Sequence, residues 1–140
     1  MPSASETAFV AAVRRQYAQL FNETERFQYP LLRMKVGSHF LERLRRIEGI
    51  SHEKIVEVCA QVASDRAKEI TGREVHRLRG GAGGAGYRSR DRDKAAAWRC
   101  SLQRGSPAAR RLHWWHISGP DGGCIEFASV GTHDDVDIPG

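Results

Sequence analysis

The chain has 140 residues, 40% of them hydrophobic and 28% charged, and its 22 basic and 17 acidic side chains give a net charge of +5. This length suits one globular domain, and the ordinary composition argues against a disordered chain, a collagen-like repeat or a membrane protein. No apolar run approaches the ~20 residues that span a bilayer, and the N-terminus lacks a signal-peptide pattern, so we expect a cytoplasmic protein.

The first half of the chain predicts three helices. Apolar residues recur at steps of three and four from about Ser5 to Phe27. Ser38 is expected to cap a second helix, which Glu48-Gly49 ends. Ser51 is expected to cap a third, which runs to Thr71-Gly72. The apolar stripe of the first helix must be covered, either by the chain's own core or by a second copy of the chain in a homodimer.

The second half predicts short strands. Beyond Gly72 the apolar period shifts toward two residues, first around Val75 and Leu78. Three further runs alternate or are rich in aromatic and β-branched residues, and Gly- and Pro-containing turns separate them; they cover residues 98–103, 111–117 and 124–130. These consecutive runs predict an antiparallel meander.

Helices followed by strands, without β-α-β alternation, predict an α+β fold. We expect the N-terminal helices to pack on one face of a small curved antiparallel sheet and to leave the other face free for a ligand. The chain should form one compact domain overall. Its three cysteines, odd in number and set in apolar segments, predict reduced core thiols without a disulfide; they are Cys59, Cys100 and Cys124.

Positive charge is concentrated in the middle of the second half. Residues 73–111 carry eleven basic and three acidic side chains, and all but one of the basic residues are arginines. The planar guanidinium fork suits phosphate geometry, so a polyanion is the favoured partner. A solvated basic surface without a specific partner is the alternative.

Cofactor and metal patterns in the chain are weak. The glycines between residues 81 and 86 match the dinucleotide fingerprint, but a polar stretch rather than a helix follows them. His113 and His116 are three residues apart and therefore lie on opposite faces of a strand, which disfavours a zinc site. The acidic residues of the tail are typical of solvated charge; they are Asp134, Asp135 and Asp137. The sequence predicts no cofactor and no metal.

Alternation along two neighbouring strands gathers a candidate catalytic site on the open sheet face. Arg99 and Ser101 share one face of the first strand, while Arg111 and His113 share a face of the next. His133 follows the third strand and is expected at the edge of the same surface. Arginine can neutralise a phosphate, and histidine, with an ordinary pKa of ~6.5, can move a proton to or from a reacting oxygen. The predicted catalytic set for metal-independent RNA cleavage is Arg99, Arg111, His113 and His133. The alternative is that the histidines merely flank a packed aromatic cluster.

A wider RNA-binding set is expected around this site. Trp114 and Trp115 are adjacent, so only one can face the core, and Trp115 is expected on the polar face, where an indole can stack on a base. Core packing of both indoles is the alternative. The predicted RNA-binding residues are Arg77, Arg79, Arg88, Arg90, Arg104, Arg110 and Trp115.

Three segments resemble the C-terminal half of toxins of the RelE/ParE superfamily. They are Trp98-Arg-Cys-Ser-Leu, Arg110-Arg-Leu-His-Trp-Trp and Ile125-Glu-Phe-Ala-Ser-Val-Gly-Thr-His-Asp-Asp. Ser38-His-Phe-Leu-Glu-Arg, followed by Gly-Ile-Ser51, is similar to the opening of small proteins related to these toxins. The resemblance covers roughly residues 36–138 and implies an N-terminal helix and extension, residues 1–35, before a RelE-like α+β domain, residues 36–140.

The resemblance implies two activities. The RelE branch implies a metal-independent endonuclease that cuts ribosome-bound mRNA, and the ParE branch implies an inhibitor of DNA gyrase; an antitoxin protein is the implied partner of either. Arg111 matches the family's phosphate-binding arginine, and His133 stands where its Val-Gly-x-Arg motif has a basic residue. The family's lysine and its C-terminal tyrosine have no counterpart, and Asp137 lies near the tyrosine position.

The leading hypothesis is therefore an endoribonuclease of toxin type, in which arginines bind phosphate and histidines act as acid and base. The alternative is a non-enzymatic toxin or binding module, either a ParE-like inhibitor or a basic RNA binder. A structural protein, whose sheet packs against another subunit, is the third hypothesis.

Overall fold

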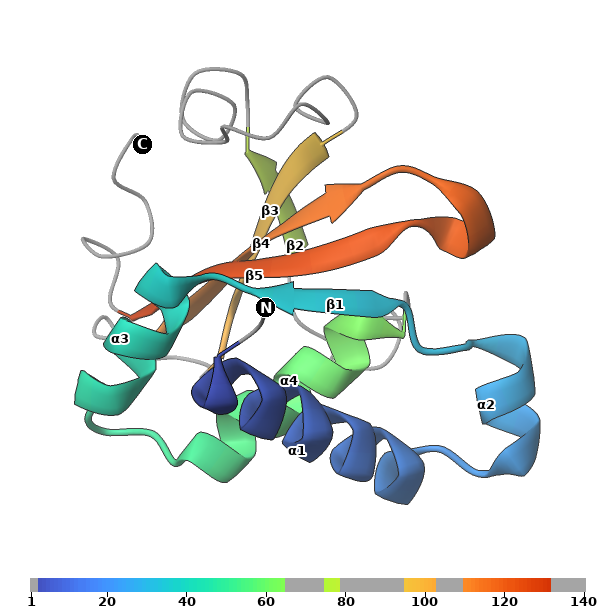
Figure 1. The fold of residues 1–140 in the computed structure, drawn as a ribbon, viewed down its shortest axis with the longest axis horizontal. Helices are drawn as coiled ribbons and strands as arrows, with labels where there is room; N and C mark the ends of the chain where they lie inside the picture. Colours follow the sequence, from blue (N-terminus) through green and yellow to red (C-terminus); the bar gives the residue numbers. More distant parts are fainter. Residues whose placement is uncertain (1–2, 65–74, 79–94, 103–109, 132–140) are drawn as a thin grey trace.

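The computed structural model describes residues 3–64, 75–78, 95–102 and 110–131, in which helices and one mixed sheet form two layers (Figure 1). The elements in chain order are α1 (Ala4–Leu20), α2 (Glu23–Gln28), β1 (Arg33–Val36), α3 (Ser38–Arg46), α4 (His52–Ala63), β2 (Val75–Leu78), β3 (Ala95–Ser101), β4 (Arg111–Ile117), a short 3-10 turn (Pro120–Gly122) and β5 (Cys124–Gly131). Helices α1 and α4 lie below the sheet in Figure 1, so the α+β arrangement with helices on one face is confirmed. No described helix is long and apolar enough to cross a membrane.

The sheet is mixed rather than wholly antiparallel. Its strand order is β1-β5-β4-β3-β2; β3, β4 and β5 form the predicted three-stranded antiparallel meander, and β2 adds a fourth antiparallel strand beside β3. Strand β1, which no sequence pattern predicts, pairs in parallel with β5. Its four residues, Arg-Met-Lys-Val, are too few for a period-2 pattern to stand out in the sequence.

The N-terminal segment forms two helices instead of the single predicted one. Asn22 ends the first stretch and caps the second: its side chain accepts a hydrogen bond from the Glu25 N–H, and the Glu25 carboxylate accepts one from the Asn22 N–H. This reciprocal capping box satisfies two N–H groups that a helix start leaves open. The turn it creates brings Tyr29 back to α1, where the Tyr17 hydroxyl donates to the Tyr29 carbonyl at 2.7 Å.

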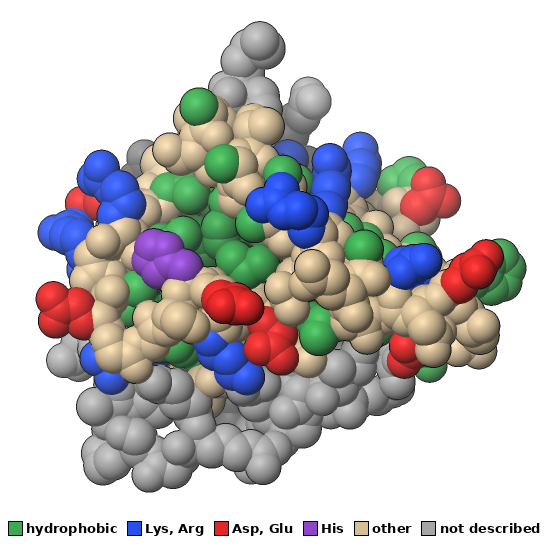
Figure 2. Space-filling view, turned by 90° about the horizontal axis from the view of Figure 1, so that it is seen from below, with side chains coloured by type: hydrophobic (Ala, Val, Ile, Leu, Met, Phe, Trp, Pro, Cys, Tyr) green, Lys and Arg blue, Asp and Glu red, His purple; other side chains and the backbone are tan. Residues whose placement is uncertain are grey.

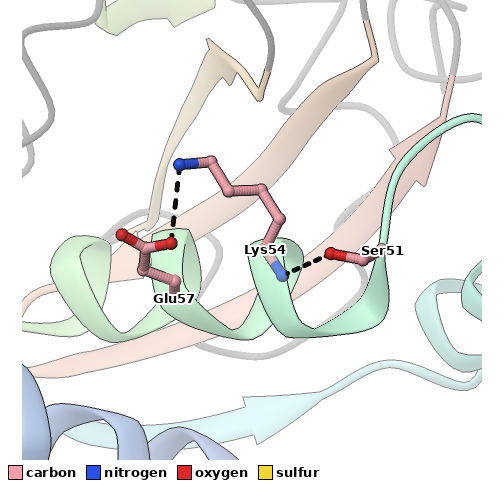
Figure 3. Close-up of polar contacts among 3 residues, drawn as sticks. All are labelled: Ser51, Lys54 and Glu57. Carbon is pink, nitrogen blue, oxygen red and sulfur yellow. Dashed lines mark hydrogen bonds and ion pairs between the residues drawn. The ribbon is translucent and has the colours of Figure 1, made fainter.

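The caps of α3 and α4 differ. Gly37, not Ser38, is the N-cap of α3, and no side chain caps that end. Ser51 caps α4 as predicted, because its hydroxyl accepts from the Lys54 N–H at 3.1 Å; the Lys54 ammonium also meets the Glu57 carboxylate (Figure 3). Helix α4 ends at Ala63, and the predicted end at Thr71-Gly72 lies outside the described residues.

The core lies between the helices and one face of the sheet. Three phenylalanines from different elements meet at its centre: Phe9 of α1 and Phe40 of α3 have ring centroids 5.1 Å apart, and Phe127 of β5 lies 5.9 Å from Phe40 and 6.2 Å from Phe9. The edge-on pairs, Phe9 with Phe40 and Phe9 with Phe127, each add about 1 kcal/mol beyond area burial. The three cysteines are buried free thiols, as expected.

The first 35 residues belong to this core and are not an appendage. Helix α1 buries Phe9, Val13 and Tyr17 in the main hydrophobic cluster, so the chain's own core covers its apolar stripe. The Glu6 carboxylate also accepts a hydrogen bond from the Val36 N–H at 2.8 Å. The division expected between residues 35 and 36 falls inside β1, which runs from Arg33 to Val36.

Replacing Ser51 with alanine should lower the free energy of unfolding by about 1 kcal/mol, because the α4 start loses its side-chain acceptor. Urea denaturation followed by circular dichroism measures this loss. Ser38→Ala is the matched control, because the Ser38 side chain does not cap α3. A loss of equal size in Ser38→Ala would contradict the assignment of the two caps.

Candidate functional site

The candidate site lies on the sheet face opposite the helices. Cross-strand pairing places Arg99 of β3 directly beside His113 of β4, and Ser101 beside Arg111. Directly opposed residues of antiparallel strands project from the same face. Their neighbours Cys100, Leu112 and Trp114 are buried in the main core. The predicted separation of a polar and an apolar face on these strands is therefore confirmed.

His113 is the centre of this arrangement. It is half-buried, and its ring centroid lies 5.7 Å from that of Trp115 with an interplanar angle of 48°. Arg99 flanks it on one side, and Ser129 of β5 is its partner on the other. Ser129 is one of few buried polar residues in the described part, with 5% of its surface exposed. The pairing places a cation, an imidazole and a hydroxyl side by side on three neighbouring strands, with the Nε2 of His113 and the Ser129 residue buried.

A β-bulge puts Ser129 in this row. His113 pairs with Ser129 but Trp114 pairs with Phe127, so Ala128 is an extra residue in β5. Without the bulge, Ser129 would share the core face with Phe127. After it, Val130 returns to the core and is fully buried. Bulges of this kind commonly re-aim side chains next to functional sites, and the sequence contains no clear signal for this one.

Trp115 lies on the predicted face but is not exposed. Only 5% of its surface is accessible, and it forms a second small apolar cluster with Ile117 and Cys124, against which Ala128 packs. The expectation of an indole open for stacking on a base is therefore wrong in this structure. Burial on this face has no signature in the alternating pattern, which distinguishes the two faces but not what covers them.

Arg110 has a different environment from Arg111. A Cβ added to Gly49, in the loop between α3 and α4, would lie 2.6 Å from Nη2 of Arg110, so the guanidinium packs against that loop. Gly49 has φ +82°, which favours glycine. Arg110, just before the start of β4, thus contacts the helical layer, whereas its predicted role was RNA binding.

Several predicted site residues lie outside the described part of the chain. They are His133, Arg79, Arg88, Arg90 and Arg104. Arg77 lies in β2, where only its backbone is described, opposite Trp98. The same strand contains a position that the sequence patterns do not single out: the backbone of His76 pairs with that of Arg99.

Charges on the neighbouring strands shape the other end of this face. Burial raises the pKa of Glu126, a partner of Trp115; the positive charge of Lys35 opposes this shift and the carboxylate of Glu6 reinforces it. Burial also raises the pKa of the Cys124 thiol, against the charges of Lys35 and Arg33. Neither Lys35 nor Arg33 was among the predicted residues, because the sequence of β1 does not identify it as a strand of the sheet.

The helical side of the molecule has a different character. Apolar side chains gather on this side, with charged groups of both signs around them (Figure 2), and residues of α1, α3 and α4 line a hollow there. The hollow measures ≈570 Å³, and Glu42, Arg45 and His52 are the charged or titratable groups in its wall. Mostly apolar, it suits side chains of a partner better than a phosphate. Among the residues described, no group of three His, Cys, Asp or Glu side chains could hold a metal ion.

No protein-family model, curated protein or solved structure matches this chain. The resemblance to the RelE/ParE superfamily therefore stays a prediction.

Glu126→Gln should become more stable relative to the wild type as pH rises from about 4 to about 7. Because the folded state holds the Glu126 proton more tightly than the unfolded chain does, the unfolding free energy of the wild type falls as pH rises from the ordinary glutamate pKa through the raised value. Glutamine cannot ionise and escapes this loss. Urea denaturation across the pH range measures the difference, with the exposed Glu48→Gln as control for removal of one carboxylate. A constant difference between Glu126→Gln and the wild type would contradict the raised pKa.

Proposed function

We propose that the protein is a metal-independent endoribonuclease of toxin type, which cuts RNA by attack of a ribose 2′-hydroxyl on the adjacent phosphate. The pairing of His113 with Arg99, next to the pair of Arg111 and Ser101, is the observation that supports this most. Two arginines bracket one imidazole on a single sheet face, which is the minimum set for holding a phosphodiester and moving its protons.

The proposed reaction is a transesterification that needs no oxidant and no metal. His113 takes the proton from the 2′-hydroxyl, the 2′-oxygen attacks phosphorus, and the bond from phosphorus to the 5′-oxygen breaks. Arg99 and Arg111 neutralise the charge that accumulates on the phosphate oxygens. A general acid, for which His133 is the sequence-based candidate, gives a proton to the leaving 5′-oxygen. The products are a 2′,3′-cyclic phosphate and a free 5′-hydroxyl.

The toxin assignment rests on the resemblance of the strand motifs to the RelE/ParE superfamily. On this proposal the protein acts in the cytoplasm on RNA, with ribosome-bound mRNA as the first substrate to test and an antitoxin as its regulator. A ParE-like inhibitor or a basic RNA binder would use the same face without chemistry, and cleavage assays separate this alternative from the nuclease.

Purified His113→Asn should cleave RNA at least about 10²-fold more slowly than the wild type, because asparagine keeps hydrogen-bonding capacity but cannot exchange a proton near neutral pH. Arg111→Ala should lose a similar factor through weaker phosphate binding and charge stabilisation. The measurement is the rate of cleavage of end-labelled RNA with chelator present, together with the chemical identity of the new ends.

His116→Asn is the matched control for this experiment. His116 is a neighbour on β4 but faces the other side, where its Nε2 lies 2.8 Å from the Gly122 carbonyl oxygen. Its variant should cleave at the wild-type rate. RNA ends that carry a 5′-phosphate would contradict the proposed mechanism, and so would equal losses of cleavage rate in the His113 and His116 variants.

Induced expression in bacterial cells should arrest growth and create new RNA 5′ ends, and Arg111→Ala/His133→Ala should do neither. The variant lacks a phosphate-binding cation and the candidate acid, so cleavage should stop even though the protein accumulates. Growth curves and mapping of RNA 5′ ends provide the measurement. Arrest without new ends would favour a protein target such as gyrase, and no arrest would favour the binding or structural alternatives.

A further inference from the structure

A second hollow opens at the far end of the same sheet face, between β1 and the turn that joins β4 to β5. It measures ≈460 Å³ and is lined by two cations, by apolar side chains and by the turn; the residues are Arg33, Met34, Lys35, Ile117, Ser118, Gly119, Pro120, Gly123 and Cys124. In Figure 1 the β4–β5 turn and the start of β1 lie at the same end of the sheet. The hollow therefore combines an edge strand with a tight turn.

The turn beside this hollow is closely packed. Gly123 has φ +90°, and a Cβ there would lie 2.2 Å from the Ile117 carbonyl oxygen. The Gly123 N–H is bonded to the Pro120 carbonyl at 3.1 Å. These contacts hold the wall in place, which lowers the ordering cost of binding a ligand.

The two cations of β1 point away from the core. Met34 packs against the main hydrophobic cluster, so Arg33 and Lys35 on either side of it project from the opposite face, and both are exposed. They pair with Cys124 and Glu126. Within the described part of the chain, no hydrogen bond or ion pair engages either side chain. Both remain available to an anion.

Phosphate is the anion that this hollow suits best. A guanidinium and an ammonium separated by one residue can share the oxygens of one phosphate or bind two successive ones. Glu126, which opposes Lys35, is not part of the wall, and burial disfavours its charge. Ile117, on the same face as these cations, adds an apolar surface to the hollow.

The position of the hollow relates it to the candidate site. Ile117 is four residues along β4 from His113, on the same face, which corresponds to roughly 14 Å at ~3.4 Å per residue. A strand of RNA bound at His113 would reach this distance within a few nucleotides. A phosphate there would be a flanking one, and not the phosphate that is cut.

We propose that the hollow between β1 and the β4–β5 turn is a phosphate subsite, in which Arg33 and Lys35 bind the RNA backbone a few nucleotides from the phosphate at His113. The choice of RNA as the ligand rests on the proposed function. Phosphate binding by the hollow does not, because a free nucleotide would present the same phosphate group. It adds to the RNA-binding surface a region that lies on the first half of the chain.

Binding of fluorescent 2′-O-methyl oligouridylates tests this subsite without cleavage, since their 2′-oxygen cannot attack. Arg33→Ala/Lys35→Ala should bind a twelve-nucleotide strand roughly tenfold more weakly than the wild type, and the slope of log affinity against log salt should fall by about 0.7 for each phosphate that the variant no longer neutralises. A three-nucleotide strand should bind both proteins alike. Arg14→Ala/Arg15→Ala, which removes two exposed charges from α1 on the helical side, should retain the wild-type slope.

Each other outcome has a definite meaning. Equal losses of affinity in the two double variants would overturn the subsite, because only the total charge would then matter. No loss of affinity in either variant would also overturn it, because neither pair of cations would then bind the RNA. Tighter competition by uridine 5′-monophosphate than by the long strand would assign the hollow to a free nucleotide and overturn the RNA path. Loss of binding in Arg33→Ala/Lys35→Ala, with unmodified RNA left uncut by the wild type, would retain the subsite and reject the proposed nuclease.

Discussion

Strand β4 is the element on which the rest of the structure depends. It pairs with β3 on one side and β5 on the other, so its side chains are divided strictly between two faces. Leu112 and Trp114 fill the core beneath the helices, while Arg111 and His113 face the opposite side. A slip of one residue would bury the polar set and expose the apolar set. The same packing that stabilises the fold therefore fixes which side chains can meet a ligand.

Much of this can be predicted from the sequence, because it depends on local period. Alternation indicates the strands that carry the candidate site and assigns the faces of β3 and β4 correctly, and it places the limits of β4 at Arg111 and Ile117. The alternation is clear in β4, whose two neighbours in the sheet, β3 and β5, are also its neighbours along the chain. The helical half is also recognisable, from its apolar steps and from the cap at Ser51.

The features that escape prediction depend on contacts between distant segments. Strand β1 is a strand only because β5, from the other end of the chain, lies beside it. The bulge at Ala128 reverses the parity of β5, so counting by twos from Phe127 places Ser129 on the wrong face. Burial of Trp115 and the contact between Arg110 and the α3–α4 loop likewise arise from packing. The capping box that divides α1 from α2 is present in the sequence as Asn-x-x-Glu, but the apolar period runs across it.

One contact at the margin of the sheet has a consequence for solubility. Strand β1 is an edge strand, and exposed edges offer unpaired backbone groups that can recruit a strand from another molecule. Here the carboxylate of Glu6 occupies the Val36 N–H, and the charged residues Arg33 and Lys35 alternate along the same strand. Helix α1 thus protects this edge from pairing with a strand of another molecule. A chain that lacks α1 would leave the edge of β1 open to aggregation.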